Sequence, residues 1–208
     1  MLEKKGFLLV DSGATYMDGT TDITRTYPLG ELTEDEKRFY TWTLQSHIDL
    51  AKAVWLDYCE CKMIDTIARE PLWRHLINYR CGTGHSVSFV GNVHEGPHAL
   101  NSRNTTRMRP GMVVTDEPGV YETDLVGIRI ENELVCIHKA DNQYGTFLGF
   151  EPLTFVPIAT SPILPGVLDK DELAWLNDYH RQVFAKLAPH LNAEERVWLA
   201  EKCASIGC

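Results

Sequence analysis

Carboxylates stand at two places in segments whose other residues favour β-strands. Asp11 and Asp22 lie 11 positions apart near the start of the chain, and Glu117 and Glu131 lie 14 positions apart in its middle. Aspartate is a poor strand former, and a carboxylate is costly to bury without a partner. These four acids are therefore candidates for one shared chemical site.

Strand alternation indicates how the acids could share a site. In "TTDITRT", Asp22 and Thr24 take the same face, and in "GIRIEN", Arg129 and Glu131 take the face opposite the two isoleucines. Four carboxylates buried together cannot all stay ionised without cations. Two divalent ions would balance their charge and leave His85, in "GTGHSVSFV", as a neutral additional ligand.

The ligand types narrow the choice of metal. Mostly oxygen ligands with a single nitrogen favour manganese, iron, cobalt or zinc. With bridging carboxylates, the two ions would lie about 3.5 to 4 Å apart, and a water bound between them becomes a nucleophile suited to an amide carbonyl. The residues alone therefore predict a two-metal hydrolase.

The first elements that would position these residues follow from local patterning. The segments "KGFLLVDSG" and "TTDITRTYPLG" predict a strand hairpin, and Asp18 beside Gly19 is typical of its turn. Thr33 and Glu36 have the spacing of a capping box and begin a helical pattern within residues 32–58. A second helix is predicted at about 62–79, kinked or divided at Pro71.

The residue pattern of the remaining sequence changes twice. From residue 81 to about 157, Gly-rich turns alternate with β-type runs, which predicts an antiparallel sheet. Residues 169–189 and 192–207 are amphipathic and predict two helices. The first of these helices should bury one stripe of side chains: Leu173, Leu176, Tyr179 and Val183. This order describes one α+β domain over residues 1–208.

Composition limits the classes of function. The formal net charge is -9, from 20 basic and 29 acidic residues, which argues against a nucleic-acid partner because that surface needs a basic stripe. The start of the chain has too short an apolar run for a signal peptide or a membrane span. Six cysteines without metal or disulfide spacing indicate reduced thiols: Cys59, Cys61, Cys81, Cys136, Cys203 and Cys208. We therefore expect a cytoplasmic protein without a membrane partner.

Several segments resemble a known enzyme family. The catalytic domain of the pita-bread metallopeptidases, which include methionine aminopeptidase, prolidase, creatinase and aminopeptidase P, is similar to "VDSGATYMDGTTDITRT", "GTGHSVSFVGNVHEGP", "TDEPGVY" and "GIRIENELV", in this order. The later segments "FLGFEPLT" and "LAWLNDYH" resemble the Xaa-Pro aminopeptidases in particular. The resemblance runs from Gly6 to Leu199 and implies a pita-bread fold, an antiparallel sheet flanked by helices.

The resemblance also implies a set of metal ligands. The ligands of a dinuclear centre would be Asp11, Asp22, His85, Glu117 and Glu131. Asp22 and Glu131 would bridge two divalent ions, with Mn²⁺ as the expected metal and Zn²⁺ or Co²⁺ as alternatives.

Further residues would act beside these ligands. The resemblance makes Glu117 the general base as well as a ligand, and it makes His94 the group that contacts the substrate carbonyl and stabilises the oxyanion. Arg129 and Thr24 share faces with ligands and are expected to support them. His98, four positions after His94, is a candidate for lining the cleft. The other histidines are expected to be surface or packing residues, namely His47, His75, His138, His180 and His190.

The implied reaction is hydrolysis of the bond between an amino-terminal residue and a following proline, so the partners would be peptides with proline at the second position. One alternative is an Xaa-Pro dipeptidase (prolidase) of the same fold. Another is a pita-bread domain with impaired catalysis that serves as a binding or assembly module. The missing front segment, described below, is the reason for keeping this second alternative. Cys81 also stands where relatives often have histidine, and Ser86 and Ser88 stand where glycines are frequent, departures expected to weaken turnover without abolishing metal binding.

The start of the chain also departs from the family. The sequence begins almost at the hairpin, so the resemblance predicts that an amino-terminal domain and the first part of the catalytic domain are missing. An uncovered sheet leaves apolar surface and an unpaired edge, both of which favour association. We therefore expect a homo-oligomer.

Overall fold

The computed structural model describes residues 2–207 and has the α+β architecture expected from the sequence. Met1 and Cys208 lie outside the described residues. The strands are β1 (Phe7–Tyr16), β2 (Gly19–Pro28), β3 (Val54–Leu56), β4 (Gly84–His85), β5 (Ala99–Leu100), β6 (Val113–Asp116), β7 (Gly119–Glu122), β8 (Val126–Arg129), β9 (Asn132–Asn142) and β10 (Gly145–Pro152). The helices are α1 (Glu34–Ala51), α2 (Cys61–Trp73), α3 (Lys170–Leu187), a 3-10 turn (Ala188–His190) and α4 (Ala193–Lys202).

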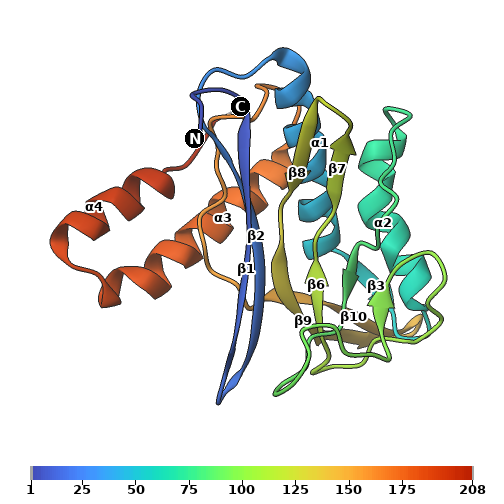
Figure 1. Cartoon of the computed structure of the whole chain (residues 1–208). Coiled ribbons are helices and arrows are strands. Elements are labelled where there is room, and N and C mark those ends of the chain that lie inside the picture. Colours follow the sequence, from blue (N-terminus) through green and yellow to red (C-terminus); the bar gives the residue numbers. More distant parts are fainter. Residues whose placement is uncertain (1, 208) are drawn as a thin grey trace.

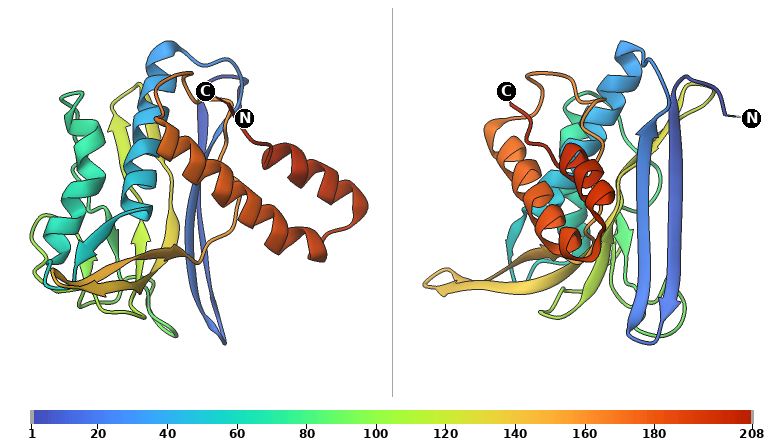
Figure 2. Two further views of the ribbon diagram at one scale, coloured as in Figure 1. Left: turned by 180° about the vertical axis from the view of Figure 1, so that it is seen from behind. Right: turned by 90° about the vertical axis from the view of Figure 1, so that its left-hand side faces the viewer.

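The predicted hairpin is formed by β1 and β2, which pair antiparallel from Phe7–Pro28 to Tyr16–Gly19, with Asp18 in the turn as expected. A close approach requires glycine at position 13, because a Cβ there would lie 2.4 Å from the Thr21 carbonyl oxygen. Figure 1 shows this long ribbon in front of the helices, and the right-hand view of Figure 2 shows it standing at the side opposite α3 and α4.

The larger sheet has the strand order β3-β10-β9-β6, and all of its pairs are antiparallel. Strand β6 pairs with β9 so that Asp116 lies opposite Asn132. A bridge between Ser86 and Val114 attaches the β4 segment to β6. Strands β7 and β8 form a separate antiparallel pair that leads directly into β9. The segments that contain His85, Glu117 and Glu131 are thereby brought to one region.

Helix α1 begins as predicted and ends earlier. Thr33 is its N-cap, and the capping box with Glu36 is present. The helical pattern was wrong beyond Ala51, because Val54–Leu56 form β3 and pair with β10. Trp55 therefore lies in a strand, not in a helix, where its pairing opposite Leu148 buries the indole.

Helix α2 also ends earlier than the predicted range of 62–79. Pro71 lies inside the helix without dividing it, and the helix ends at Trp73. Leu76 has a positive φ of 60°, and the Ile77 amide returns to the Leu72 carbonyl at 3.1 Å. This left-handed residue turns the chain, so the helix cannot continue to Tyr79.

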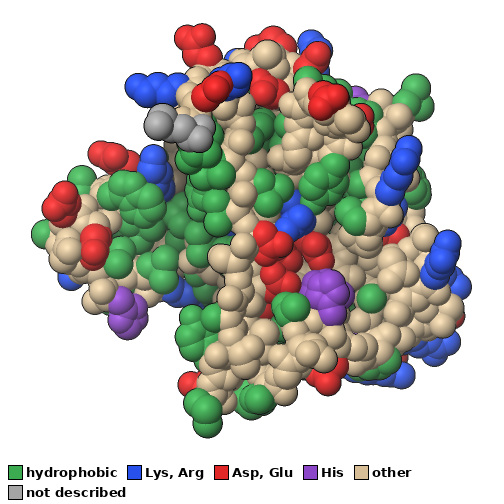
Figure 3. All heavy atoms as spheres, viewed as in Figure 1, with side chains coloured by type: hydrophobic (Ala, Val, Ile, Leu, Met, Phe, Trp, Pro, Cys, Tyr) green, Lys and Arg blue, Asp and Glu red, His purple; other side chains and the backbone are tan. Residues whose placement is uncertain are grey.

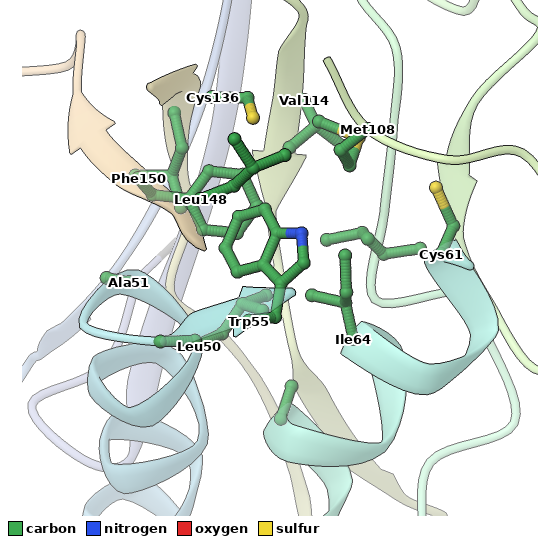
Figure 4. Close-up of a cluster of buried hydrophobic side chains, with 14 residues drawn as sticks. Leu50, Ala51, Trp55, Cys61, Ile64, Met108, Val114, Cys136, Leu148 and Phe150 are labelled. Carbon is green, nitrogen blue, oxygen red and sulfur yellow. The ribbon is translucent and has the colours of Figure 1, made fainter. Parts of the chain in front are cut away.

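The core consists of two main clusters. In the first, Trp55 lies among buried side chains from β10, β6 and α2, and its ring contacts that of Phe150 at a centroid distance of 4.6 Å (Figure 4). In the second, Ile128 and Ile130 pack towards α1 and α3. The stripe of Leu173, Leu176, Tyr179 and Val183 on α3 is buried as predicted.

Two sequence predictions concern thiols and membranes. The five cysteines within residues 2–207 are free thiols. Over the same part of the chain, every helix falls short of the length or the hydropathy needed to cross a membrane.

Candidate metal centre

Three of the five predicted ligands converge most closely. Asp22, His85 and Glu131 each offer a ligand atom, and these atoms lie within 4.8 Å of one another. The distance between His85 Nε2 and Asp22 Oδ2 is 3.5 Å. They come from β2, β4 and the two-residue segment between β8 and β9. Figure 3 shows acidic side chains gathered with a basic and a histidine side chain near the middle of one face of the molecule.

Glu117 joins this group from the residue after β6. Its Oε1 lies 3.2 Å from His85 Nε2 and accepts a hydrogen bond of 3.0 Å from Thr115 Oγ1. The same threonine oxygen accepts the His85 amide at 3.0 Å, and the Glu117 amide donates to the Thr83 carbonyl at 2.7 Å. Thr115 and Thr83 therefore fix His85 and Glu117 relative to each other.

Asp11 joins the group through Arg129. An Arg129 amino group contacts the Asp11 carboxylate, while Nε of the same guanidinium donates to Thr24 Oγ1 at 2.9 Å. Thr24 in turn donates to Glu131 Oε2 at 2.5 Å, and Tyr121 accepts from Arg129 at 2.8 Å. The structure thus brings all five predicted ligands into one connected set, with Asp11 half exposed at its edge.

The backbone of Glu131 is held from behind by Arg25. The Glu131 amide donates to the Thr24 carbonyl at 3.0 Å, and Arg25 donates to the Glu131 carbonyl at 2.5 Å. Arg25 is only 3% exposed and makes six hydrogen bonds, all to neutral acceptors. They join β2 to the start of β9, to Val156 and Pro157, and to Tyr179 of α3.

The protonation of the acids and the imidazole is perturbed in the direction that favours a cation site. Burial, the Glu117 charge and the Asp22 charge raise the pKa of Glu131 to about 8. Burial alone would lower the pKa of His85, but its hydrogen bonds to Asp22 and Glu117 outweigh burial and raise it to about 10. Both raised pKa values mean that this group of residues favours added positive charge. The residues therefore fit a pair of divalent ions.

The two remaining predicted residues are placed differently from each other. His94 is exposed beside the group, with its ring centroid 3.7 Å from that of His85. His98 is buried, donates from Nε2 to the Val113 carbonyl at 2.7 Å, and lines a cavity next to the group instead of joining it.

A buried ion pair behind the site was missed from the sequence. Asp65 and Arg69 of α2 pair at 2.8 Å, and Asp65 also accepts a hydrogen bond from Thr83. Arg69 donates to the carbonyl oxygens of Tyr79 and Cys81 at 2.8 and 2.9 Å. The pair anchors the segment that leads into His85. An acid and a base four positions apart usually lie on an exposed helix face, so their spacing gave no signal of burial.

A second buried pair lies on the opposite face of the strands. His47 Nδ1 is 3.1 Å from Asp116 Oδ2, and Asn132 contacts the other ring nitrogen at 3.3 Å. His47 was expected to be a surface or packing residue and is fully buried. Burial raises the pKa of Asp116 to about 6, although His47 acts against this. Asp116 and Asn132 precede and follow Glu117 and Glu131 in sequence, so the dyad lies directly behind two predicted ligands.

Buried carboxylates and one imidazole, gathered on an antiparallel sheet, define a domain of the metal-binding class with oxygen-rich ligands. The comparisons give its family. The chain belongs to metallopeptidase family M24, whose sequence profile matches residues 1–138, and the profile of the C-terminal region of peptidase M24 matches residues 146–206.

The most similar relatives include plant and animal enzymes. Aminopeptidase P1 of Lotus japonicus is 42% identical over 212 residues and covers 99% of this chain, and aminopeptidase P2 of Arabidopsis thaliana is 43% identical over 95% of it. A solved X-prolyl aminopeptidase of Caenorhabditis elegans, described as a cytosolic enzyme with a di-nuclear active site, has a TM-score of 0.90 at 39% identity over 95% of the chain. The resemblance to Xaa-Pro aminopeptidases and the pita-bread fold are confirmed.

The relatives are longer than this chain. It spans 32% and 29% of the length of the two plant proteins and 33% of the Caenorhabditis elegans chain. A prolidase of Pyrococcus furiosus is more distant, with a TM-score of 0.63 at 28% identity over 73% of this chain and 42% of its own.

Proposed function

We propose that this chain carries the catalytic centre of an Xaa-Pro aminopeptidase, which hydrolyses the bond between an amino-terminal residue and a following proline. The convergence of Asp22, His85 and Glu131 within 4.8 Å is the observation that supports this most. The proposal also draws on the roughly 40% identity to aminopeptidases P over nearly the whole chain.

Two divalent ions would be held by Asp11, Asp22, His85, Glu117 and Glu131. Asp22 and Glu131 would be shared between both ions, and Mn²⁺ is our first choice of metal, with Zn²⁺ and Co²⁺ as alternatives. When bound, such a pair polarises the peptide carbonyl and makes a water nucleophilic near neutral pH.

Protein side chains would transfer the proton, stabilise the oxyanion and orient the ligands. The Glu117 carboxylate would take a proton from the attacking water and return it to the leaving nitrogen. His94, exposed beside His85, would donate a hydrogen bond to the substrate carbonyl oxygen as negative charge develops there. Arg129 would keep Asp11 and Thr24 oriented through the contacts described above.

A prolidase activity is the second candidate, because solved prolidases share this fold. The two activities differ in substrate length. We expect cleavage of an Xaa-Pro-Xaa tripeptide by the chain, whereas hydrolysis confined to an Xaa-Pro dipeptide would favour prolidase.

Impaired catalysis is the remaining alternative, because the chain spans only about a third of the length of its relatives. A single experiment separates it from both activities: metal content of the purified chain, measured together with tripeptide and dipeptide cleavage, with and without added Mn²⁺. Two ions bound per chain with neither peptide cleaved would favour a binding module. Absence of bound metal under all conditions would contradict the proposed function itself.

We also propose a cytoplasmic, self-associating protein. The free thiols fit a reducing compartment. Val10 and Tyr16 are exposed on β1, the outer strand of the hairpin, and Met17 is exposed in the turn that follows it. Apolar side chains along an unpaired strand favour association. Light scattering that found a compact monomer at all concentrations would contradict self-association.

A further inference from the structure

A cavity of about 710 Å³ lies beside the candidate metal centre. The tip of the β1–β2 hairpin, the segment after His85 and the start of β9 line it. Three lining residues adjoin predicted ligands in sequence: Thr20 is two positions from Asp22, Ser86 follows His85, and Glu133 is two positions from Glu131. Because alternate residues of a strand share a face, Thr20 points to the same side of β2 as Asp22.

Polar atoms without partners gather in this cavity. Within residues 2–207, eight buried side-chain nitrogen and oxygen atoms have no hydrogen-bond partner, and four of them line it. They are Thr20 Oγ1, Ser88 Oγ, His98 Nδ1 and Glu133 Oε1. All four residues are more than nine-tenths buried. Buried polar atoms are normally paired, so the group indicates a ligand that supplies the missing bonds.

The unpaired atoms can all accept hydrogen bonds. His98 uses Nε2 to donate to the Val113 carbonyl at 2.7 Å, so in the neutral ring Nδ1 carries a lone pair. The Glu133 carboxylate accepts, and the hydroxyls of Thr20 and Ser88 can turn to accept. A ligand rich in N–H donors is therefore the complementary one.

The charge and shape of the cavity point to a cation with an apolar stem. Glu133 and Asp18 line it, and no lysine or arginine of the described chain does. Tyr16 and Phe89, at 60% and 69% exposed, add aromatic surface to its lining. Long basic side chains combine an alkyl stem with an ammonium or guanidinium group, which matches a lining of exposed aromatic rings and the buried Glu133 carboxylate.

We propose that this cavity binds the side chain of a lysine or arginine at the amino terminus of the substrate, with Glu133 as its anionic partner. The inference rests on the proposed function. Proline occupies the second position of such a substrate, so a basic side chain next to the hydrolysed bond belongs to the first residue. The cavity would thereby select the substrates Lys-Pro and Arg-Pro from among the Xaa-Pro peptides.

The first test compares Arg-Pro-Gly with Met-Pro-Gly, at pH 8 and with Mn²⁺ added to the full chain. Wild-type protein should favour the arginine peptide by about tenfold in kcat/KM, and Glu133→Gln should remove most of this ratio while keeping side-chain size. Glu201→Gln, an exposed acid on α4, is the matched control and should keep the ratio. A ratio near one in wild-type protein, or an unchanged ratio in Glu133→Gln, would overturn the inference and leave the proposed function standing.

The second test does not depend on hydrolysis. Calorimetric titration of wild-type protein should detect L-argininamide more tightly bound than L-methioninamide, and Glu133→Gln should weaken the first by about tenfold. Thr20→Val, which removes one acceptor at nearly constant size, should cause a smaller loss. Should neither peptide be cleaved, this titration still decides: selective binding lost with Glu133 supports the cavity, and equal binding of both amides contradicts it. Thermal unfolding of each variant identifies any that fail to fold.

Discussion

Thr24 and Glu131, 107 positions apart in sequence, are joined by a hydrogen bond of 2.5 Å from the threonine hydroxyl to the buried carboxylate. Arg129 donates to the same hydroxyl at 2.9 Å, so Thr24 connects the Arg129 guanidinium to a predicted bridging ligand through two hydrogen bonds. Groups that orient a ligand affect metal affinity even though they do not touch the metal.

Thr24→Val should therefore weaken Mn²⁺ binding by about 10-fold or more. The change keeps the size of the side chain and removes the donor to Glu131. Competition with a chelator measures the affinity. Thr66→Val, an exposed threonine on α2, is the control. Wild-type affinity in Thr24→Val would show that the hydroxyl does not orient Glu131.

Glu131→Ala should abolish both tight binding of the metal pair and peptide hydrolysis. Its carboxylate is the proposed bridge. Among the described residues, only Asp22 supplies a second carboxylate to the group of three closely placed ligand atoms. Elemental analysis of the purified variant gives the number of ions. Two ions still bound per chain would show that the bridging assignment is wrong.

Arg129→Lys should reduce kcat/KM by about 10-fold, although the charge is kept. The guanidinium contacts Asp11, Thr24 and Tyr121 at once, and an ammonium group has no fixed fork to hold three partners. Steady-state hydrolysis of an Xaa-Pro-Xaa tripeptide measures the loss. If the lysine variant keeps full activity, the charge alone is sufficient at this position.

Asp65→Ala should lower the free energy of unfolding by about 3 kcal/mol, because it leaves the buried Arg69 guanidinium without its carboxylate. Helix α2 supplies a matched control in the exposed pair Glu70–Arg74, which has the same spacing. Glu70→Ala should cost less than about 1 kcal/mol. Urea unfolding of both variants compares them, and equal losses would show that Asp65 has no special structural role.

His180 should make the fold sensitive to acid. Burial and the Arg25 charge lower its pKa to about 4, and Nε2 accepts the Ile158 amide at 3.1 Å. In the unfolded chain the ordinary pKa is about 6.5. Between these values the unfolded state binds the proton and the native state does not, so the free energy of unfolding falls as pH drops from about 6.5 to about 4.

The contribution of His180 can be isolated with His180→Gln. The difference in unfolding free energy between wild type and variant should shrink across this pH range, by up to about 3 kcal/mol. Urea unfolding at several pH values measures the difference, with His190→Gln, which removes an exposed imidazole, as the control. A difference that stays constant with pH would contradict the assignment.

Much of the fold followed from patterns local to the chain. Alternation in "GIRIEN" placed Ile128 and Ile130 in the core, with Arg129 and Glu131 opposite, because a strand repeats every two residues. The capping box at Thr33 marked the start of α1. The end of α2 was missed, since a leucine with a positive φ carries no signal comparable to that of glycine.

The candidate site was predictable where its residues lie in strand-like segments and less so where distant parts meet. The convergence of Asp22, His85 and Glu131 required the family resemblance as well as alternation. Asp65 and His47 were not singled out, because their partners are distant in sequence: Thr83 is 18 positions from Asp65, and the Asp116 carbonyl is 69 positions from His47. Burial of such groups depends on tertiary packing, which no local pattern encodes.

The six hydrogen bonds of Arg25 bear on the order in which the protein folds and binds metal. They join four stretches of chain, and every acceptor is a neutral protein oxygen. We therefore expect the polypeptide to fold in a cell starved of metal, with the backbone of Glu131 already in position. We expect maturation to run in one order, in which folding comes first and capture of the ions comes last.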